Sequence, residues 1–401
     1  MLTSFALIFI CAIALGEICQ KIRIPPLVGM LVTGIGLGAA GLIHPAIMDA
    51  APDLREIALI IILLRAGLAI DISDLKAVGR PAILMCFVPA TFEMAVVTLL
   101  APPLFGISYI EAAIMGAVLG AVSPAVIVPR MLKIQSQGYG AKKGLPQLIM
   151  AGSSVDDIYL IVLFTVFMGM EKGDGFNAWQ LTAIPISIIT GILIGIAAGL
   201  ALHFLFSRWH ANDTVKLLVI FSVAFLLVAL ENESALVFAG EDLFSGLLAV
   251  MALGVTLLRM DTDMAARLSN KFSAVWVAAE IILFVLVGAA ISFDFSVGQA
   301  LRAIGLIAVA MVVGRFSGVL VCLARTPFNH REKLFCVVSY IPKATVQAAI
   351  GAIPLSQGVA GGGVILVVAV LSILVTAPLG DVLMNLTYKK LLNKDIAEVP
   401  A

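Results

Sequence analysis

Two adjacent aspartates, Asp156 and Asp157, lie near the middle of the apolar stretch 146–170. On insertion scales, one ionised carboxylate at the centre of a membrane helix costs at least roughly 2.5–3.5 kcal/mol, and two adjacent carboxylates also repel each other. Because neighbouring residues on a helix point about 100° apart, these two acids face different surroundings. One acid can therefore face an ion cavity while the other faces a structural base.

Oxygen atoms close to these acids can complete a site for a hard cation, because such cations prefer oxygen ligands. The candidate ligands are carboxylates, hydroxyls and backbone carbonyls at or near Asp157, Asp156, Ser153, Ser154, Val122 and Ser123. Carboxylates also bind protons, so one site can hold either a cation or protons, and that competition is sufficient for antiport. The alternative is a buried acid pair that is simply neutralised by Arg or Lys.

Three bases, Arg65, Arg315 and Lys343, lie inside apolar segments and need partners. Arg65 lies near the end of its span and is interpreted as an anchoring residue. Arg315 cannot lose its proton, so it must be paired with Glu93, with Asp156 or with both. Lys343 lies beside a proline and can titrate, so it either neutralises the carbonyl ends of a half-helix or carries a transported proton. Thr345, two residues further on, is polar and can reach an ion through water.

The composition indicates the class of protein in which these charges lie. Of 401 residues, 61% are hydrophobic and 12% are charged, whereas soluble domains are about half apolar and a quarter charged. The apolar runs are too long for the strands of a barrel, and about 20 apolar residues span a bilayer as a helix. The sequence therefore predicts an all-α polytopic membrane protein with about thirteen transmembrane helices: 2–20, 26–43, 54–70, 80–101, 108–132, 146–170, 178–206, 215–230, 243–258, 270–291, 298–324, 333–354 and 363–388.

The basic residues favour one orientation of these spans. Most of the 25 lysines and arginines lie in loops that follow odd-numbered spans or in the C-terminal tail. The positive-inside rule then predicts an N-terminus outside and a C-terminus in the cytoplasm. The hydrophilic stretches are too short for a nucleotide-binding module, which argues against ATP-driven transport by this chain. The basic residues form no stripe, which argues against nucleic-acid binding.

Spans five and twelve resemble each other, because each is interrupted near its centre, at 121–125 and 341–345. They are seven spans apart and so run in opposite directions, which predicts an inverted-topology repeat of spans 1–6 and 8–13, with span seven as a linker. This pairing matches Glu93 with Arg315. Interrupted helices at membrane depth are tolerated only where they are buried in protein or line a wet cavity.

Five segments carry a resemblance to a known family: 16–31, 64–71, 122–125, 155–158 and 342–347. In their order and spacing they resemble the monovalent cation/proton antiporter superfamily, and within it the sodium/proton antiporter branch that includes the animal NHA exchangers. The resemblance covers almost the whole chain. It implies a homodimer and an elevator-like movement of a core that holds two crossed broken helices.

By this resemblance the chain divides into three parts. Residues 1–76 and 212–291 would form a dimerisation panel, 80–175 and 297–390 a mobile ion-translocating core, and 177–211 a linker helix. Asp157 would be the ion-binding acid and Asp156 its companion. Ser123 would belong to one crossover, and Lys343 and Thr345 to the other.

Arg315 departs from the family pattern, because it stands where electrogenic members often have lysine. The paired aspartates resemble the electrogenic pattern, so the stoichiometry stays open.

The predicted function is exchange of Na⁺ or Li⁺ for H⁺, with Asp157 and Asp156 as the shared site and Glu93, Arg315 and Lys343 as a supporting charge network. The chain is then a transporter without a cofactor, located in a membrane that we expect to be a bacterial inner or cell membrane. The alternatives are a sodium-coupled organic-solute symporter and a K⁺/H⁺ antiporter. An intramembrane aspartyl protease is disfavoured, because adjacent acids on one helix cannot converge on one water. A channel would not need such an acid pair.

Overall fold

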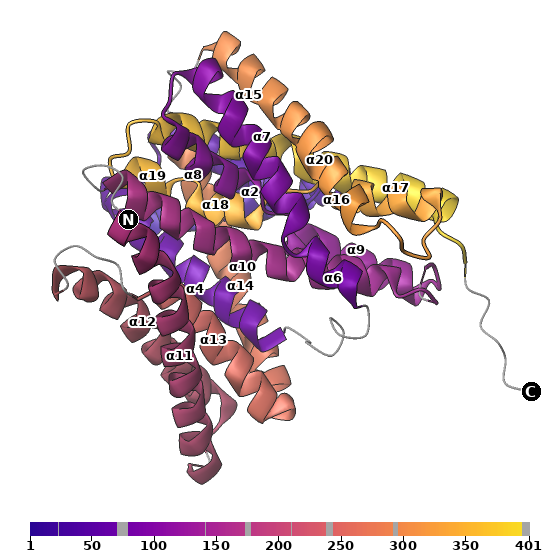
Figure 1. Cartoon of the computed structure of the whole chain (residues 1–401). Helices are drawn as coiled ribbons and strands as arrows, with labels where there is room; N and C mark the ends of the chain where they lie inside the picture. Colours follow the sequence, from indigo (N-terminus) through magenta and orange to yellow (C-terminus); the bar gives the residue numbers. More distant parts are fainter. Residues whose placement is uncertain are drawn as a thin grey trace, which may run out of the picture. The chain divides into compact units, whose positions relative to one another are not determined.

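The protein is all-helical throughout the part of the chain that its computed structural model describes (Figure 1). The described residues are 1–22, 24–69, 79–140, 142–172, 178–209, 211–237, 244–291 and 296–394. The β-structure among them is a single isolated antiparallel bridge between Tyr139 and Lys394. This agrees with the predicted fold class.

Each of the thirteen predicted spans overlaps one or more helices. Within the described residues, nine helical stretches are long and apolar enough to cross a membrane: Leu2–Lys21, Arg80–Phe105, Tyr109–Ser136, Leu145–Glu171, Ile189–Arg208, Asp213–Glu231, Thr262–Ala289, Val297–Cys322 and Gly362–Leu391. Part of the difference between nine stretches and thirteen predicted spans comes from shorter apolar helices, at Pro26–Ala39, Gly246–Met260 and Thr345–Ser356. The count of thirteen crossings and the inverted repeat stay predictions.

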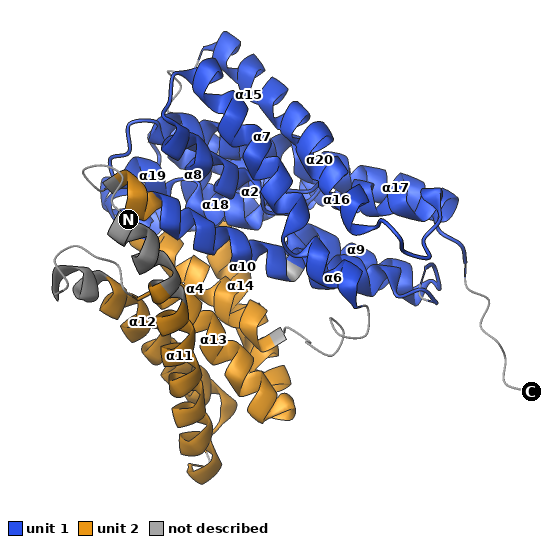
Figure 2. Ribbon diagram, in the orientation of Figure 1, with its two compact units in different colours: residues 1–52, 71–167, 283–401 blue, residues 53–70, 168–282 orange. Residues whose placement is uncertain are grey.

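The chain forms two compact units (Figure 2). Unit 1 comprises Met1–Pro52, Asp71–Phe167 and Leu283–Ala401. Its helices are α1 (Leu2–Lys21), α2 (Pro26–Ala39), α3 (Pro45–Asp49), α6 (Arg80–Met85), α7 (Val88–Phe105), α8 (Tyr109–Leu119), α9 (Pro124–Ser136), most of α10 (Leu145–Lys172), α15 (Val297–Val309), the π-helix η1 (Ala310–Arg315), α16 (Phe316–Cys322), α17 (His330–Ser339), α18 (Thr345–Ile350), α19 (Ile353–Ser356) and α20 (Gly362–Leu391).

Unit 2 comprises Asp53–Ile70 and Met168–Ile282. Its helices are α4 (Ala51–Ala69), α11 (Ala178–Arg208), α12 (Asp213–Val237), α13 (Gly246–Met260) and most of α14 (Thr262–Ala289). Residues 1–52 belong to unit 1, whereas the prediction groups 1–76 with 212–291 by function. Contacts within one chain identify neither a dimer interface nor a moving part, so the panel, core and linker stay predictions.

Helix α20 holds α8 and α9 in place within unit 1. At the start of α20, the Gly361 N–H donates to Glu111 of α8, with N to Oε1 at 2.5 Å. Further along α20, Asp381 accepts from two nitrogens of Arg130 on α9: Nε donates to Oδ1 at 2.8 Å and Nη2 donates to Oδ2 at 2.6 Å. Bidentate pairs of this kind fix geometry as well as adding energy. The two helices that flank the first interruption therefore share one support.

The first part of unit 1 packs through small residues. Gly34 on α2 lies against the backbone of Val285, so closely that an added Cβ would clash with the Val285 carbonyl oxygen. Close approach of helix backbones is the usual role of small residues in membrane helices. Gly36, two residues along the same helix, has nothing within 4 Å of an added Cβ.

These two glycines give a matched test of the packing. We expect Gly34→Ala to lower stability by about 1–3 kcal/mol, because the extra methyl group overpacks the contact. Gly36→Ala should leave stability unchanged or raise it, because alanine favours the helix by about 1 kcal/mol over glycine. Thermal melting of the purified protein in detergent measures both effects. Equal melting temperatures for the two variants would contradict the packing described for α2.

Candidate functional site

Two interrupted helices meet inside unit 1. The first interruption lies between Leu119, where α8 ends, and Pro124, where α9 begins; the second lies between Ser339 and Thr345. Proline has no N–H to donate and is favoured at the first position of a helix, so Pro124 gives a local reason for the restart of α9. The backbone N–H of Ser123 donates to the carbonyl oxygen of Pro342 at 2.8 Å. The two interruptions are therefore in direct backbone contact.

Side chains from the second interruption and α18 bind the carbonyl end of α8. The Lys343 ammonium donates to the Leu119 carbonyl, with Nζ to O at 2.5 Å. The Gln347 amide nitrogen donates to the Val118 and Ala121 carbonyls at 3.0 and 2.9 Å. The last carbonyls of a helix have no partner inside it and carry partial negative charge. Lys343 therefore lies where it can neutralise the half-helix end, as one of its two predicted roles requires.

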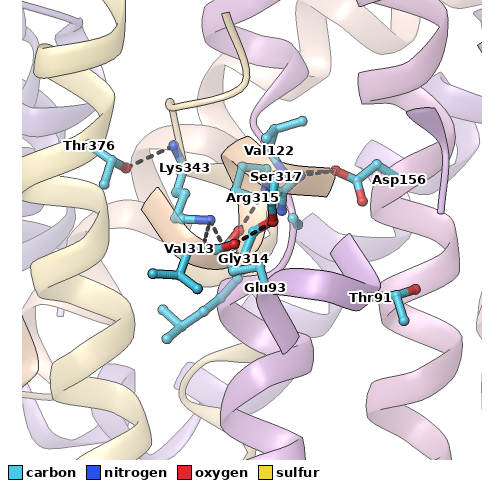
Figure 3. Close-up of polar contacts among 12 residues, drawn as sticks. Thr91, Glu93, Val122, Asp156, Val313, Gly314, Arg315, Ser317, Lys343 and Thr376 are labelled. Carbon is cyan, nitrogen blue, oxygen red and sulfur yellow. Dashed lines mark hydrogen bonds and ion pairs between the residues drawn. The ribbon is translucent and has the colours of Figure 1, made fainter. Parts of the chain in front are cut away.

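Four buried charges form a continuous chain (Figure 3). Lys343 Nζ lies 2.7 Å from Glu93 Oε1, and Arg315 Nε lies 2.6 Å from Glu93 Oε2. Arg315 Nη1 lies 3.1 Å from Asp156 Oδ2. Every member of this chain is at most 1% exposed. Both predicted partners of Arg315 thus contact it, and bases alternate with acids.

Arg315 comes at the end of the π-helix η1, which interrupts the α-helical course between α15 and α16. Single-turn π segments inside α-helices are rare and are frequent at functional sites. Arg315 is fully buried and cannot be deprotonated. Its buried positive charge therefore needs acidic partners, and more than one of its nitrogen atoms needs an acceptor. Glu93 from α7 and Asp156 from α10 supply them.

The two aspartates have different surroundings. Oδ2 of Asp156 accepts from Arg315 and from the backbone N–H of Val122, the latter at 3.3 Å. Its Oδ1 is buried and has no hydrogen-bond partner among the residues that the structure describes. Asp157 is half-buried, and its Oδ1 is likewise buried with no hydrogen-bond partner in the described part of the chain. Asp156 is thus a member of the charge chain. Asp157 contributes an acid that none of the ion pairs found among the described residues includes.

The other predicted ligands are in different situations. The hydroxyls of Ser123 and Thr345 are buried, and no described residue forms a hydrogen bond with either. The Ser153 hydroxyl instead donates to the Met150 carbonyl at 3.0 Å, within α10. Val122 contacts Asp156 through its N–H, and the side chain of Ser154 lies outside the described part of the structure. Within the described residues, two carboxylate and two hydroxyl oxygens among the predicted ligands therefore remain without partners, as candidate ligands for a hard cation.

Sequence reasoning missed two residues of this site. Oγ1 of Thr376 on α20 accepts from the backbone N–H of Lys343 at 3.0 Å (Figure 3). The Tyr340 ring lies with its centroid 6.0 Å from the Arg315 guanidinium, and its buried hydroxyl packs so closely on Gly152 that a Cβ there would clash. The available signals were a hydroxyl residue in the apolar run of α20 and a tyrosine two residues before Pro342.

Comparisons with known proteins identify the family of this chain. The family model described as sodium/hydrogen exchanger, transmembrane, matches residues 5–385. Sodium/hydrogen exchanger 9B2 of Homo sapiens is 32% identical, over 98% of this chain and 75% of that protein. Sodium/hydrogen exchanger 9B1 of Homo sapiens is 31% identical, over 97% and 78%. These relatives are animal proteins, so the bacterial location expected for this chain stays a prediction, as does the orientation of its termini.

A solved structure shares the fold. The sodium proton antiporter MjNhaP1 from Methanocaldococcus jannaschii superposes with a TM-score of 0.81, over 96% of this chain and 97% of that one, at 20% identity. With a family model that matches nearly the whole sequence and a fold shared with a solved antiporter, the resemblance seen in the five sequence segments is confirmed. The chain is a multi-pass membrane protein that belongs to the sodium/hydrogen exchanger family.

Proposed function

We propose that this protein exchanges Na⁺ or Li⁺ for H⁺, and that the cation and protons compete for Asp157 and Asp156. The observation that carries the proposal is the pair of buried Oδ1 atoms of Asp156 and Asp157, which have no hydrogen-bond partner among the described residues, with Asp156 in contact with the first interruption. Membership of the sodium/hydrogen exchanger family supports the pair of ions. Glu93, Arg315 and Lys343 then serve as the supporting charge network.

Competition follows from the chemistry of the oxygens. A carboxylate that binds a partly dehydrated cation needs its negative charge and its lone pairs, and a proton removes both. Buried in protein, an acid without a base beside it is stable only when it is protonated or bound to a cation. Asp157 fits this description better than Asp156, because Asp156 already accepts from Arg315.

The proposal includes alternating access by an elevator-like movement in a homodimer. The predicted mobile core, 80–175 and 297–390, contains both interruptions and all four charges of the chain. The proposal also places the N-terminus outside the membrane and the C-terminus in the cytoplasm.

The cation is tested by transport in proteoliposomes with an imposed pH gradient and a pH-sensitive dye. We expect Na⁺ and Li⁺ to dissipate the gradient and K⁺ to do so weakly, with and without a clamped membrane potential. Dissipation by K⁺ alone would favour a K⁺/H⁺ antiporter instead. Sodium-driven uptake of an organic solute without proton flux would favour a symporter.

The acid is tested by Asp157→Asn, which keeps the shape of the side chain and removes its charge. We expect Na⁺-dependent proton exchange to be abolished, because the remaining amide cannot neutralise the cation. The matched control is Asp213→Asn, since Asp213 forms a half-exposed ion pair with Arg267 at 3.1 Å, and such pairs contribute about 0–1 kcal/mol. An Asp157→Asn protein that transports like the Asp213→Asn protein would contradict the assignment.

The charge network is tested by Arg315→Gln against Arg267→Gln. Removal of one partner from a buried ion pair costs about 3–5 kcal/mol, because the other charge stays buried and unpaired. We therefore expect a clear fall in melting temperature for Arg315→Gln and little change for Arg267→Gln, whose arginine is 54% exposed. Equal melting curves would show that the buried chain does not stabilise the fold.

A further inference from the structure

One peptide group in the first interruption has both of its polar atoms bound by side chains. The carbonyl oxygen of Ala121 accepts from Gln347 Nε2 at 2.9 Å. The N–H of the same peptide, which belongs to Val122, donates to Asp156 Oδ2 at 3.3 Å. The peptide between Ala121 and Val122 therefore lies between an amide on α18 and a carboxylate on α10.

The planar trans peptide makes these two contacts dependent on each other. Its C=O and N–H bonds are fixed in one plane and point in opposite directions. With the carbonyl held by Gln347, the N–H must point away from Gln347, which is where Asp156 lies. Inside a helix, bonds between residues four apart would set this orientation, but residues 120–123 lie between α8 and α9.

Gln347 is well placed to hold this peptide. Its side chain is fully buried, and its nitrogen also contacts the Val118 carbonyl at 3.0 Å, one turn earlier on α8. On the other side of the peptide, the Ser123 N–H is held by the Pro342 carbonyl at 2.8 Å. Of these contacts, the bond from Gln347 is the one that holds the carbonyl oxygen of Ala121.

We propose that Gln347 is a positioning residue for the cation site, acting through the Ala121–Val122 peptide. This inference rests on the proposed exchange at Asp157 and Asp156. Without the amide donor, the peptide loses the hydrogen bond that fixes its carbonyl oxygen, and its N–H is held toward Asp156 by the long 3.3 Å contact alone. The peptide can then rotate and the Val122 N–H can leave Asp156. Asp156 Oδ2 then loses a donor, and the Ala121 carbonyl can turn toward the acids, so the oxygens offered to the cation change in number and direction.

A residue that only stabilised the fold would behave differently. Its loss would reduce the amount of folded protein and the maximal rate of transport, while the molecules that remained folded would bind Na⁺ normally. A positioning residue changes the concentration of Na⁺ at which transport is half-maximal. Comparing the change in half-maximal Na⁺ concentration with the change in maximal rate therefore separates a positioning role from a purely structural one.

The test compares Gln347→Met with Gln137→Met in proteoliposomes. Methionine keeps the length of the side chain and removes the amide donor. Gln137 lies just after α9, where its Oε1 accepts from Tyr388 at 2.9 Å, so its replacement removes a hydrogen bond in the same unit without touching the peptide. For Gln347→Met we expect the KM for Na⁺ to rise about tenfold, with a smaller change in maximal rate. A tenfold change corresponds to loss of one hydrogen bond to a charged group, here the bond from the Val122 N–H to the Asp156 carboxylate. Gln137→Met should keep the wild-type KM.

A second measurement follows the peptide itself and does not depend on transport. In protein labelled with ¹⁵N-valine, the amide signal of Val122 can be assigned by its absence in Val122→Ile. We expect this signal to shift in Gln347→Met and to stay unchanged in Gln137→Met. An unshifted Val122 signal, or an unchanged KM for Na⁺, would overturn the proposal. If the wild-type protein exchanges no Na⁺ for H⁺, the proposed function fails, and the amide signal still decides whether Gln347 holds the peptide.

Discussion

Lys343 makes the contact on which the rest of the site depends, because its ammonium group belongs to two structures at once. It donates to the Leu119 carbonyl at the end of α8, and it pairs with Glu93 at 2.7 Å. An interrupted helix at membrane depth needs partners for its free carbonyls, and a buried acid needs a base. A single lysine satisfies both needs, which ties the interruption of α8 to the chain of charges that includes Arg315.

Glu93 and Arg315 extend this link to α10. Glu93 contacts its two partners through its two carboxylate oxygens, and Arg315 contacts its two partners through Nε and Nη1. The charges therefore alternate from Lys343 to Asp156. Asp156 is therefore held from both sides, by Arg315 and by the Val122 N–H of the interruption. Asp157, one residue further, keeps a buried carboxylate oxygen that no described residue contacts by a hydrogen bond. Two adjacent residues of the same type thus differ because the helix turns one of them toward the charge chain.

The sequence was informative where burial leaves few choices. An arginine in an apolar span must pair with an acid, so Glu93 and Asp156 could be named as partners of Arg315 before the structure. The interruptions could be placed because proline and polar residues in the middle of a span disfavour a continuous helix. Thr376 and Tyr340 could not be found in this way, because their roles depend on which helices lie next to Lys343 and Gly152. The packing of residues 1–52 with unit 1 likewise depends on tertiary contacts, such as that of Gly34 with Val285.

The alternation of charges also bears on the proposed movement of the core. Lys343, Glu93, Arg315 and Asp156 comprise two bases and two acids in direct contact. A group of charges that compensate one another interacts much less with a low-dielectric surrounding than an isolated charge does. If these four residues move together, their charges cancel at every depth in the membrane. In the proposed exchange, the charge that changes the energy of the movement is then that of the cation or protons bound at Asp157 and Asp156, so occupancy of this site can decide when the core moves.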